Sequence, residues 1–159
     1  MTPAARTAAV IELLSDGPEN VPAGQVLRRG LQKRRYAGSG DRAAISALFW
    51  TVHRTLARLG WHLQQHGYAP TPRALVLAAL ALVDQLPADD IAAMFGGDSK
   101  HVAVALDEEE IALVAAFEGR TLDVSSMPRD VLLEWPAGLL ADVDAALGDA
   151  ADAELAAMR

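Results

Sequence analysis

The chain has 159 residues, of which 52% are hydrophobic and only 5% aromatic, a composition that suits one folded domain and excludes a disordered chain. It contains no cysteine, which excludes a disulfide framework, a thiolate nucleophile and a cysteine-based zinc site. The net charge of −7 is distributed unevenly between the two halves of the chain. Residues 1–73 hold 10 Lys and Arg against 4 Asp and Glu, a net +6, whereas residues 74–159 hold 4 against 17, a net −13.

Alanine and leucine, with 32 and 22 residues, dominate the composition, and this bias favours helices over strands. Apolar residues at helical spacing predict an all-α bundle of about seven to eight helices. The expected helices cover residues 3–14, 23–36, 41–65, 73–86, 88–95, 107–119, 138–147 and 149–159. The helix at 41–65 has the most regular apolar stripe, and the helix at 73–86 is apolar on nearly every side, which predicts the hub of the bundle.

The chain shows no targeting or membrane signal. Its amino terminus lacks the apolar run of a signal peptide, and the longest apolar run, residues 74–83, is ten residues long. A membrane-spanning helix needs about 20. We therefore expect a cytoplasmic protein without a membrane partner.

A basic cluster lies in the helix at 23–36 and flanks its apolar stripe of Leu27 and Leu31. Its members are Arg28, Arg29, Lys33 and Arg35. Such cations can bind phosphates by releasing counterions, which predicts sequence-independent and salt-sensitive affinity for nucleic acid; the alternative is a solvated charged face. Arg34 projects close to the apolar stripe, so we expect it to extend along the surface or to pair internally, with Asp41 as a nearby partner.

A second candidate lies on the polar side of the helix at 41–65, where Trp50, Arg54, Arg58 and Trp61 follow spacings of four, four and three. Arginine side chains can bind phosphate, and arginine and tryptophan side chains can stack on unpaired bases. The alternative is that the two tryptophans pack against other helices.

No motif predicts catalysis. His62 and His66 have the spacing of two metal ligands but lack further ligands, and the glycine-containing loop at 96–100 lacks the Walker spacing. The acidic run at 107–110 predicts a helix start with Asp107 and Glu110 as a capping pair, with docking of a basic protein as the alternative. We therefore expect no catalytic residue, cofactor site or metal site in this chain.

Two stretches carry a resemblance to a known family. Residues 34–45, with the turn Gly38-Ser39-Gly40-Asp41-Arg42, and residues 50–61 resemble the amino-terminal NusB-like domain of RsmB-type (Sun/Fmu) ribosomal RNA 5-methylcytosine methyltransferases. The segments at 107–110, 128–133 and 154–158 are similar in order and spacing, so the resemblance covers nearly the whole chain.

The resemblance implies a NusB-like helical domain at residues 1–147 that binds ribosomal RNA. Residues 148–159, whose helix runs to the last residue without a cap, would begin the connection to a carboxy-terminal methyltransferase domain absent from this chain. That domain would hold the catalytic cysteines and S-adenosylmethionine. The implied RNA contacts are the basic positions Arg28, Arg29, Lys33, Arg35, Arg42, Arg54 and Arg58.

Three hypotheses of function remain open. The first is an accessory RNA-binding domain that presents ribosomal RNA to the methyltransferase domain. The second is a stand-alone NusB-like transcription antitermination factor, which would also bind RNA. The third is a helical protein-interaction module whose acidic half docks a basic partner.

Overall fold

The structure is a computed structural model that describes residues 1–18, 20–97 and 101–158. All regular secondary structure in these ranges is helical, which confirms the predicted all-α class. The helices are α1 (Pro3–Asp16), α2 (Ala23–Lys33), α3 (Ser39–Arg54), α4 (Leu56–Gln65), α5 (Pro72–Leu82), α6 (Ala88–Ala92), α7 (Glu108–Phe117), α8 (Arg129–Leu133), α9 (Ala137–Leu147), the 3-10 turn η1 (Gly148–Ala150) and α10 (Ala151–Ala157).

Short polar residues fix where several helices begin. The hydroxyl of Thr2 accepts a hydrogen bond from the Ala5 amide at 3.2 Å and caps α1. At the start of α7, the Glu110 amide donates to the Asp107 carboxylate at 2.8 Å, and the Asp107 amide donates to the Glu110 carboxylate at 3.2 Å. The predicted capping pair at 107–110 is therefore confirmed, because each carboxylate accepts from an amide that the helix leaves unbonded.

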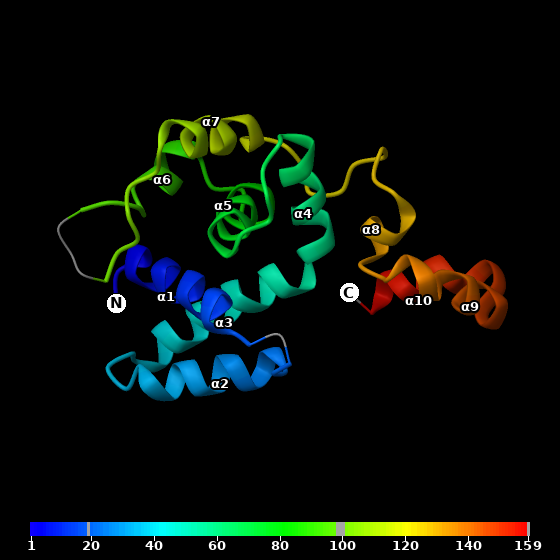
Figure 1. The fold of residues 1–159 in the computed structure, drawn as a ribbon, viewed down its shortest axis with the longest axis horizontal. Helices are drawn as coiled ribbons and strands as arrows, with labels where there is room; N and C mark the ends of the chain where they lie inside the picture. The colour runs from blue at the N-terminus through cyan, green and yellow to red at the C-terminus, as the bar shows by residue number, and fades with distance from the viewer. Residues whose placement is uncertain (19, 98–100, 159) are drawn as a thin grey trace.

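The hub of the bundle is α5, as its sequence predicts. Every residue from Ala74 to Leu82 is buried, and Figure 1 shows α5 nearly end-on inside a ring formed by α1, α3, α4, α6 and α7. The largest fully buried side chains of the surrounding helices include Phe49 and Phe117. Helix α2 lies outside this ring, against α1 and α3.

The helix expected at 41–65 is in fact two helices, so that prediction of one unbroken helix was wrong. The chain bends at Thr55, which separates α3 from α4 and has φ −122° and ψ 21°. The Thr55 hydroxyl donates to the Thr51 carbonyl at 2.7 Å, a bond that bends helices. The amides of Ala57 and Arg58 then point away from α3 and donate to the carboxylate of Glu134, at 2.8 and 3.0 Å.

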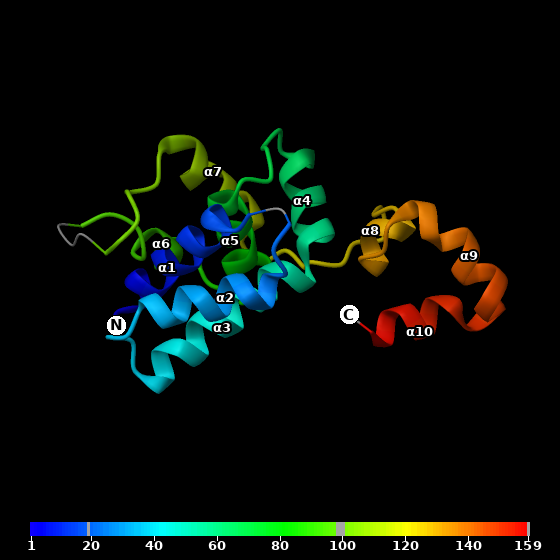
Figure 2. The same cartoon turned by 60° about the horizontal axis from the view of Figure 1, so that its bottom comes forward.

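The last three helices and η1 form a lobe, residues 129–158, that projects from one side of the bundle (Figures 1 and 2). Its buried residues Leu133, Ala151 and Leu155 lie outside the main core cluster, which ends at Phe117. Because α9 packs against η1 and α10, the boundary expected at residue 147 falls inside this lobe. Among the described helices, the longest has 16 residues, and none is long and apolar enough to cross a membrane.

Candidate nucleic-acid interface

Helix α2 presents its basic residues to solvent because its other face is tightly packed. Leu27 and Gly30 are buried, and a Cβ built on Gly30 would lie only 1.9 Å from Cδ2 of Leu13. Glycine at this position therefore lets α1 and α2 approach closely. With the inner face fixed in this way, the residues on the flanks of the apolar stripe point outward.

The four basic residues predicted on these flanks are all exposed. None of them makes a side-chain hydrogen bond or ion pair to the described part of the chain. Two depressions adjoin them. One of about 270 Å³ is lined by Arg28, Arg29 and two glutamines. The other, of about 210 Å³, has Arg29 and Lys33 in its lining together with Asp16 and several apolar residues. We call Arg28, Arg29, Lys33 and Arg35 the α2 basic surface.

Most other arginines are neutralised by acids. Arg6 pairs with Asp41 at 2.8 Å, Arg73 pairs with Glu110 at 2.6 Å, and Arg129 pairs with two aspartates of the acidic lobe. Within residues 1–18, 20–97 and 101–158, the exposed cations with no acidic partner are those of the α2 basic surface, Arg54 and Arg120. The unneutralised positive charge of the described chain is therefore concentrated on α2.

Arg34 pairs internally, as expected, but with a different partner. Its guanidinium forms an ion pair with Glu12 and donates to the Gly30 carbonyl at 3.1 Å. Asp41, the partner named from the sequence, is already occupied by the amino group of Met1 at 3.0 Å and by Arg6. Hydrogen bonds from that amino group and then from Arg6 hold the pKa of Asp41 below its ordinary value.

Arg42 braces the turn between α2 and α3. Its Nε donates to the Ala37 carbonyl at 2.9 Å and its Nη2 donates to the Arg34 carbonyl at 3.4 Å, and the side chain is half-buried. The guanidinium is therefore committed to two backbone carbonyls of the turn, and that of Arg34 also accepts from the Ala37 amide at 3.0 Å. It holds the shape of the turn rather than presenting a free cation beside the α2 basic surface.

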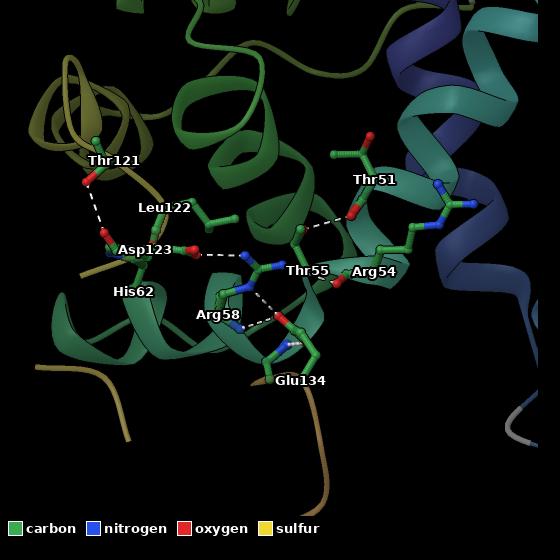
Figure 3. Close-up of polar contacts among 10 residues, drawn as sticks. Thr51, Arg54, Thr55, Arg58, His62, Thr121, Leu122, Asp123 and Glu134 are labelled. Carbon is green, nitrogen blue, oxygen red and sulfur yellow. Dashed lines mark hydrogen bonds and ion pairs between the residues drawn. The ribbon is translucent and has the colours of Figure 1, made fainter. Parts of the chain in front are cut away.

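Arg58 is the clearest departure from the predicted interface. It is only 8% exposed, and Figure 3 shows its guanidinium between two carboxylates, Asp123 at 2.7 Å from Nη1 and Glu134 at 2.9 Å from Nε. Burial opposes the charge, but hydrogen bonds to Asp123 and then to Glu134 outweigh it and raise the pKa of Arg58. Because its charge is enclosed and neutralised, Arg58 is a structural residue and not a surface contact for phosphate.

The remaining members of the second candidate lie apart from one another. Arg54 is exposed and lines a depression of about 460 Å³ together with His53 and Trp135. Trp50 packs edge-on against Phe49, with ring centroids 5.6 Å apart, and lies against Gly24 of α2, as in the packing alternative. Trp61 faces a different hollow from Arg54, so the predicted row of tryptophans and arginines is not one surface.

Two of the histidines, His53 and His62, are partly or wholly enclosed by the fold. His62 is buried, and its Nε2 lies 2.8 Å from the Leu122 carbonyl; because a carbonyl can only accept, Nε2 carries the proton. Burial lowers the pKa of both His53 and His62. No group of three or more potential metal ligands occurs among the described residues.

The loop at 96–100 and the acidic run at 107–110 lie on either side of the segment that leads into α7. Of the loop at 96–100, residues 98–100 lie outside the described residues. In the acidic run at 107–110, Glu110 caps α7 and pairs with Arg73, whereas Glu108 and Glu109 are exposed. The run therefore begins a helix, and one of its carboxylates is already committed to the fold.

Comparisons with known protein families, curated proteins and solved structures give no match to this chain.

Proposed function

We propose that this chain is an RNA-binding domain that contacts RNA through the α2 basic surface. The observation that carries the proposal is the placement of unpaired charge. In a chain with net charge −7, four exposed cations of one helix and its following turn form no ion pair with an acid of the described residues. Phosphate groups of a nucleic acid would supply that neutralisation and release counterions.

RNA is the proposed nucleic acid because of the resemblance of residues 34–45 and 50–61 to NusB-like domains. The same resemblance supports an accessory role, in which the domain presents ribosomal RNA to a methyltransferase domain that uses S-adenosylmethionine. We assign no catalytic step to the residues of this chain. A cytoplasmic location and a carboxy-terminal catalytic partner are parts of the same proposal, and a stand-alone antitermination factor is the alternative with the same RNA chemistry.

A protein-interaction module is the second candidate, and one observation favours it. Residues 129–158 contain one arginine against seven Asp and Glu, and none of the residues of α9 is buried. Leu139 and Leu147 of this helix are 46% and 42% exposed. An exposed apolar stripe surrounded by acids suits a basic partner with apolar side chains.

An affinity measurement at low salt tests the RNA proposal. We expect the variant with Arg28, Arg29, Lys33 and Arg35 all replaced by Ala to bind a fluorescently labelled single-stranded RNA at least about tenfold more weakly, because phosphate contacts dominate affinity. Fluorescence anisotropy gives the dissociation constants, and circular dichroism checks that the variant is folded.

The matched control replaces the three arginines by Lys and keeps Lys33. It retains every charge, so it should bind nearly as well as the wild type. Equal affinity of the wild type and the alanine variant would rule out the α2 basic surface as the RNA contact.

A further inference from the structure

A further hollow, far from α2, combines an aromatic ring with an unpaired cation. It lies between the second half of α4 and the segment that follows α7, and its volume is about 630 Å³. Its lining includes Trp61, His62, Gln65, Arg120, Thr121 and Ser126. In Figure 1, α7 and the upper part of α4 lie across the bundle from α2.

The aromatic wall of this hollow is held in place by the core. The ring of Trp61 lies edge-on to that of His62, with centroids 5.2 Å apart. His62 is fixed in turn by its hydrogen bond to the Leu122 carbonyl (Figure 3) and by an edge-on contact with Phe117 at 5.9 Å. Trp61 itself is half-buried, and it contributes to the lining of the hollow.

The cation of the hollow also projects from an anchored backbone. The Arg120 amide donates to the Phe117 carbonyl at 3.0 Å, and the Arg120 carbonyl accepts from the Gln85 side chain at 2.9 Å. The Arg120 side chain is exposed and has no acidic partner in the described ranges. Its side chain thus extends from an anchored backbone and lines the hollow.

The charge around the hollow favours an anion. No carboxylate lines it, and the neighbouring carboxylate of Asp123 is held by Arg58 at 2.7 Å. Gln65, Thr121 and Ser126 add amide and hydroxyl groups to the lining. Sites for unpaired RNA usually combine three components. Aromatic rings stack on the bases, arginines bind the phosphates, and polar groups bind the base edges or the ribose hydroxyls.

We propose that this hollow binds one nucleotide of an unpaired RNA strand, with its base stacked on Trp61 and its phosphate at Arg120. The polar side chains of Gln65 and Ser126 bind the base edge or the ribose hydroxyls. This inference extends the proposed RNA binding, but it uses none of the residues of the α2 basic surface. RNA binding by the hollow and RNA binding by the α2 basic surface can therefore be tested separately.

The test compares variants of the hollow in titrations with a short oligouridine, uridine monophosphate and an RNA duplex. Trp61→Ala and Arg120→Gln should each weaken oligouridine binding by about 5- to 100-fold, whereas Trp61→Phe, which keeps an aromatic face, should retain most of the affinity. Arg120 is exposed, so Arg120→Gln leaves the fold intact. In the alanine variant of the α2 basic surface, adding Trp61→Ala should still weaken oligouridine binding further.

Unchanged oligouridine affinity in both Trp61→Ala and Arg120→Gln would overturn the proposal, whatever the α2 variants do. Duplex binding that depends on Trp61 as strongly as oligouridine binding would also overturn it, because paired bases are not free to stack on a side chain. If uridine monophosphate binds as tightly as the oligouridine, the hollow takes a free nucleotide and the RNA strand is not its ligand.

Discussion

Arg58 and Arg28 carry the same guanidinium in opposite environments. Arg58 is 8% exposed and lies between two carboxylates, so removing it would leave Glu134 without its counter-charge in a mostly buried position. Arg28 is exposed, and no described residue neutralises it. The first arginine therefore contributes to stability, and the second is available to a ligand.

Replacing Arg58 by Ala should lower the free energy of unfolding by about 3 kcal/mol, because it breaks a buried ion pair and leaves an acid unpaired. Urea denaturation measures the change. Arg54, one turn earlier and exposed, is the matched control, and Arg54→Ala should change stability by less than about 0.5 kcal/mol. A loss as small for Arg58→Ala as for Arg54→Ala would contradict the structural role of Arg58.

His62 should make the fold less stable in mild acid. Burial lowers the pKa of His62 below its ordinary value of 6.5 in the folded chain, so the unfolded chain binds more protons just below pH 6.5. The stabilising contribution of the neutral ring is fully present above that pH and is lost as the pH falls through the folded pKa. Denaturation midpoints between pH 7 and pH 5 should fall less steeply for His62→Gln than for the wild type, and parallel curves would exclude His62 as the cause.

At the scale of the element, the two glycines of α2 have different surroundings. A Cβ on Gly24 would lie 3.9 Å from the Trp50 ring, an ordinary contact, whereas a Cβ on Gly30 would overlap Leu13. Leu13 is buried against the core. The close packing that turns the α2 basic surface outward thus depends on Gly30 and not on Gly24.

Substitution of each glycine by Ala should therefore have opposite effects. Gly24→Ala should raise stability by about 0.5 kcal/mol, because alanine loses less conformational entropy on folding. Gly30→Ala should lower it by about 1 kcal/mol, because the overlap with Leu13 outweighs the gain in helix propensity. Thermal or urea denaturation separates the two, and stabilisation by both would show that α1 and α2 pack less closely than described.

Structural features that depend on neighbouring residues could be predicted from the sequence. The break between α3 and α4 at Thr55 could not. The caps at Thr2 and Asp107 and the hub at α5 follow from nearby residues and from hydropathy. The α3/α4 break depends on Glu134, which accepts from the Ala57 amide 77 residues away. The apolar stripe continues across the break, so periodicity alone predicts one helix.

In the candidate interface, too, only the features with local causes could be predicted from the sequence. Exposure of the α2 basic surface follows from its position on the flanks of the Leu27 and Leu31 stripe. The burial of Arg58 does not, because its partners lie 65 and 76 residues further along the chain. For the same reason no local pattern joins Trp61 to Arg120, which come together only when α4 packs beside α7.

At the scale of the whole molecule, the charge imbalance of the sequence is also an imbalance in space. Helix α2 lies on the outside of the bundle, and the acidic lobe of α8, α9 and α10 projects from another side (Figures 1 and 2). The arginine of that lobe is paired with two of its own aspartates. An RNA strand attracted to α2 would therefore be repelled by the lobe, which orients the strand along the basic side.

The most direct test of the central claim is the salt dependence of RNA affinity. When log K is plotted against log salt concentration, each phosphate neutralised on a single strand makes the slope more negative by about 0.7. We expect a steep negative slope for the wild type and a slope shallower by about 3 when the four residues of the α2 basic surface are replaced by Ala. The same slope for both proteins would contradict the claim that these cations bind RNA phosphates.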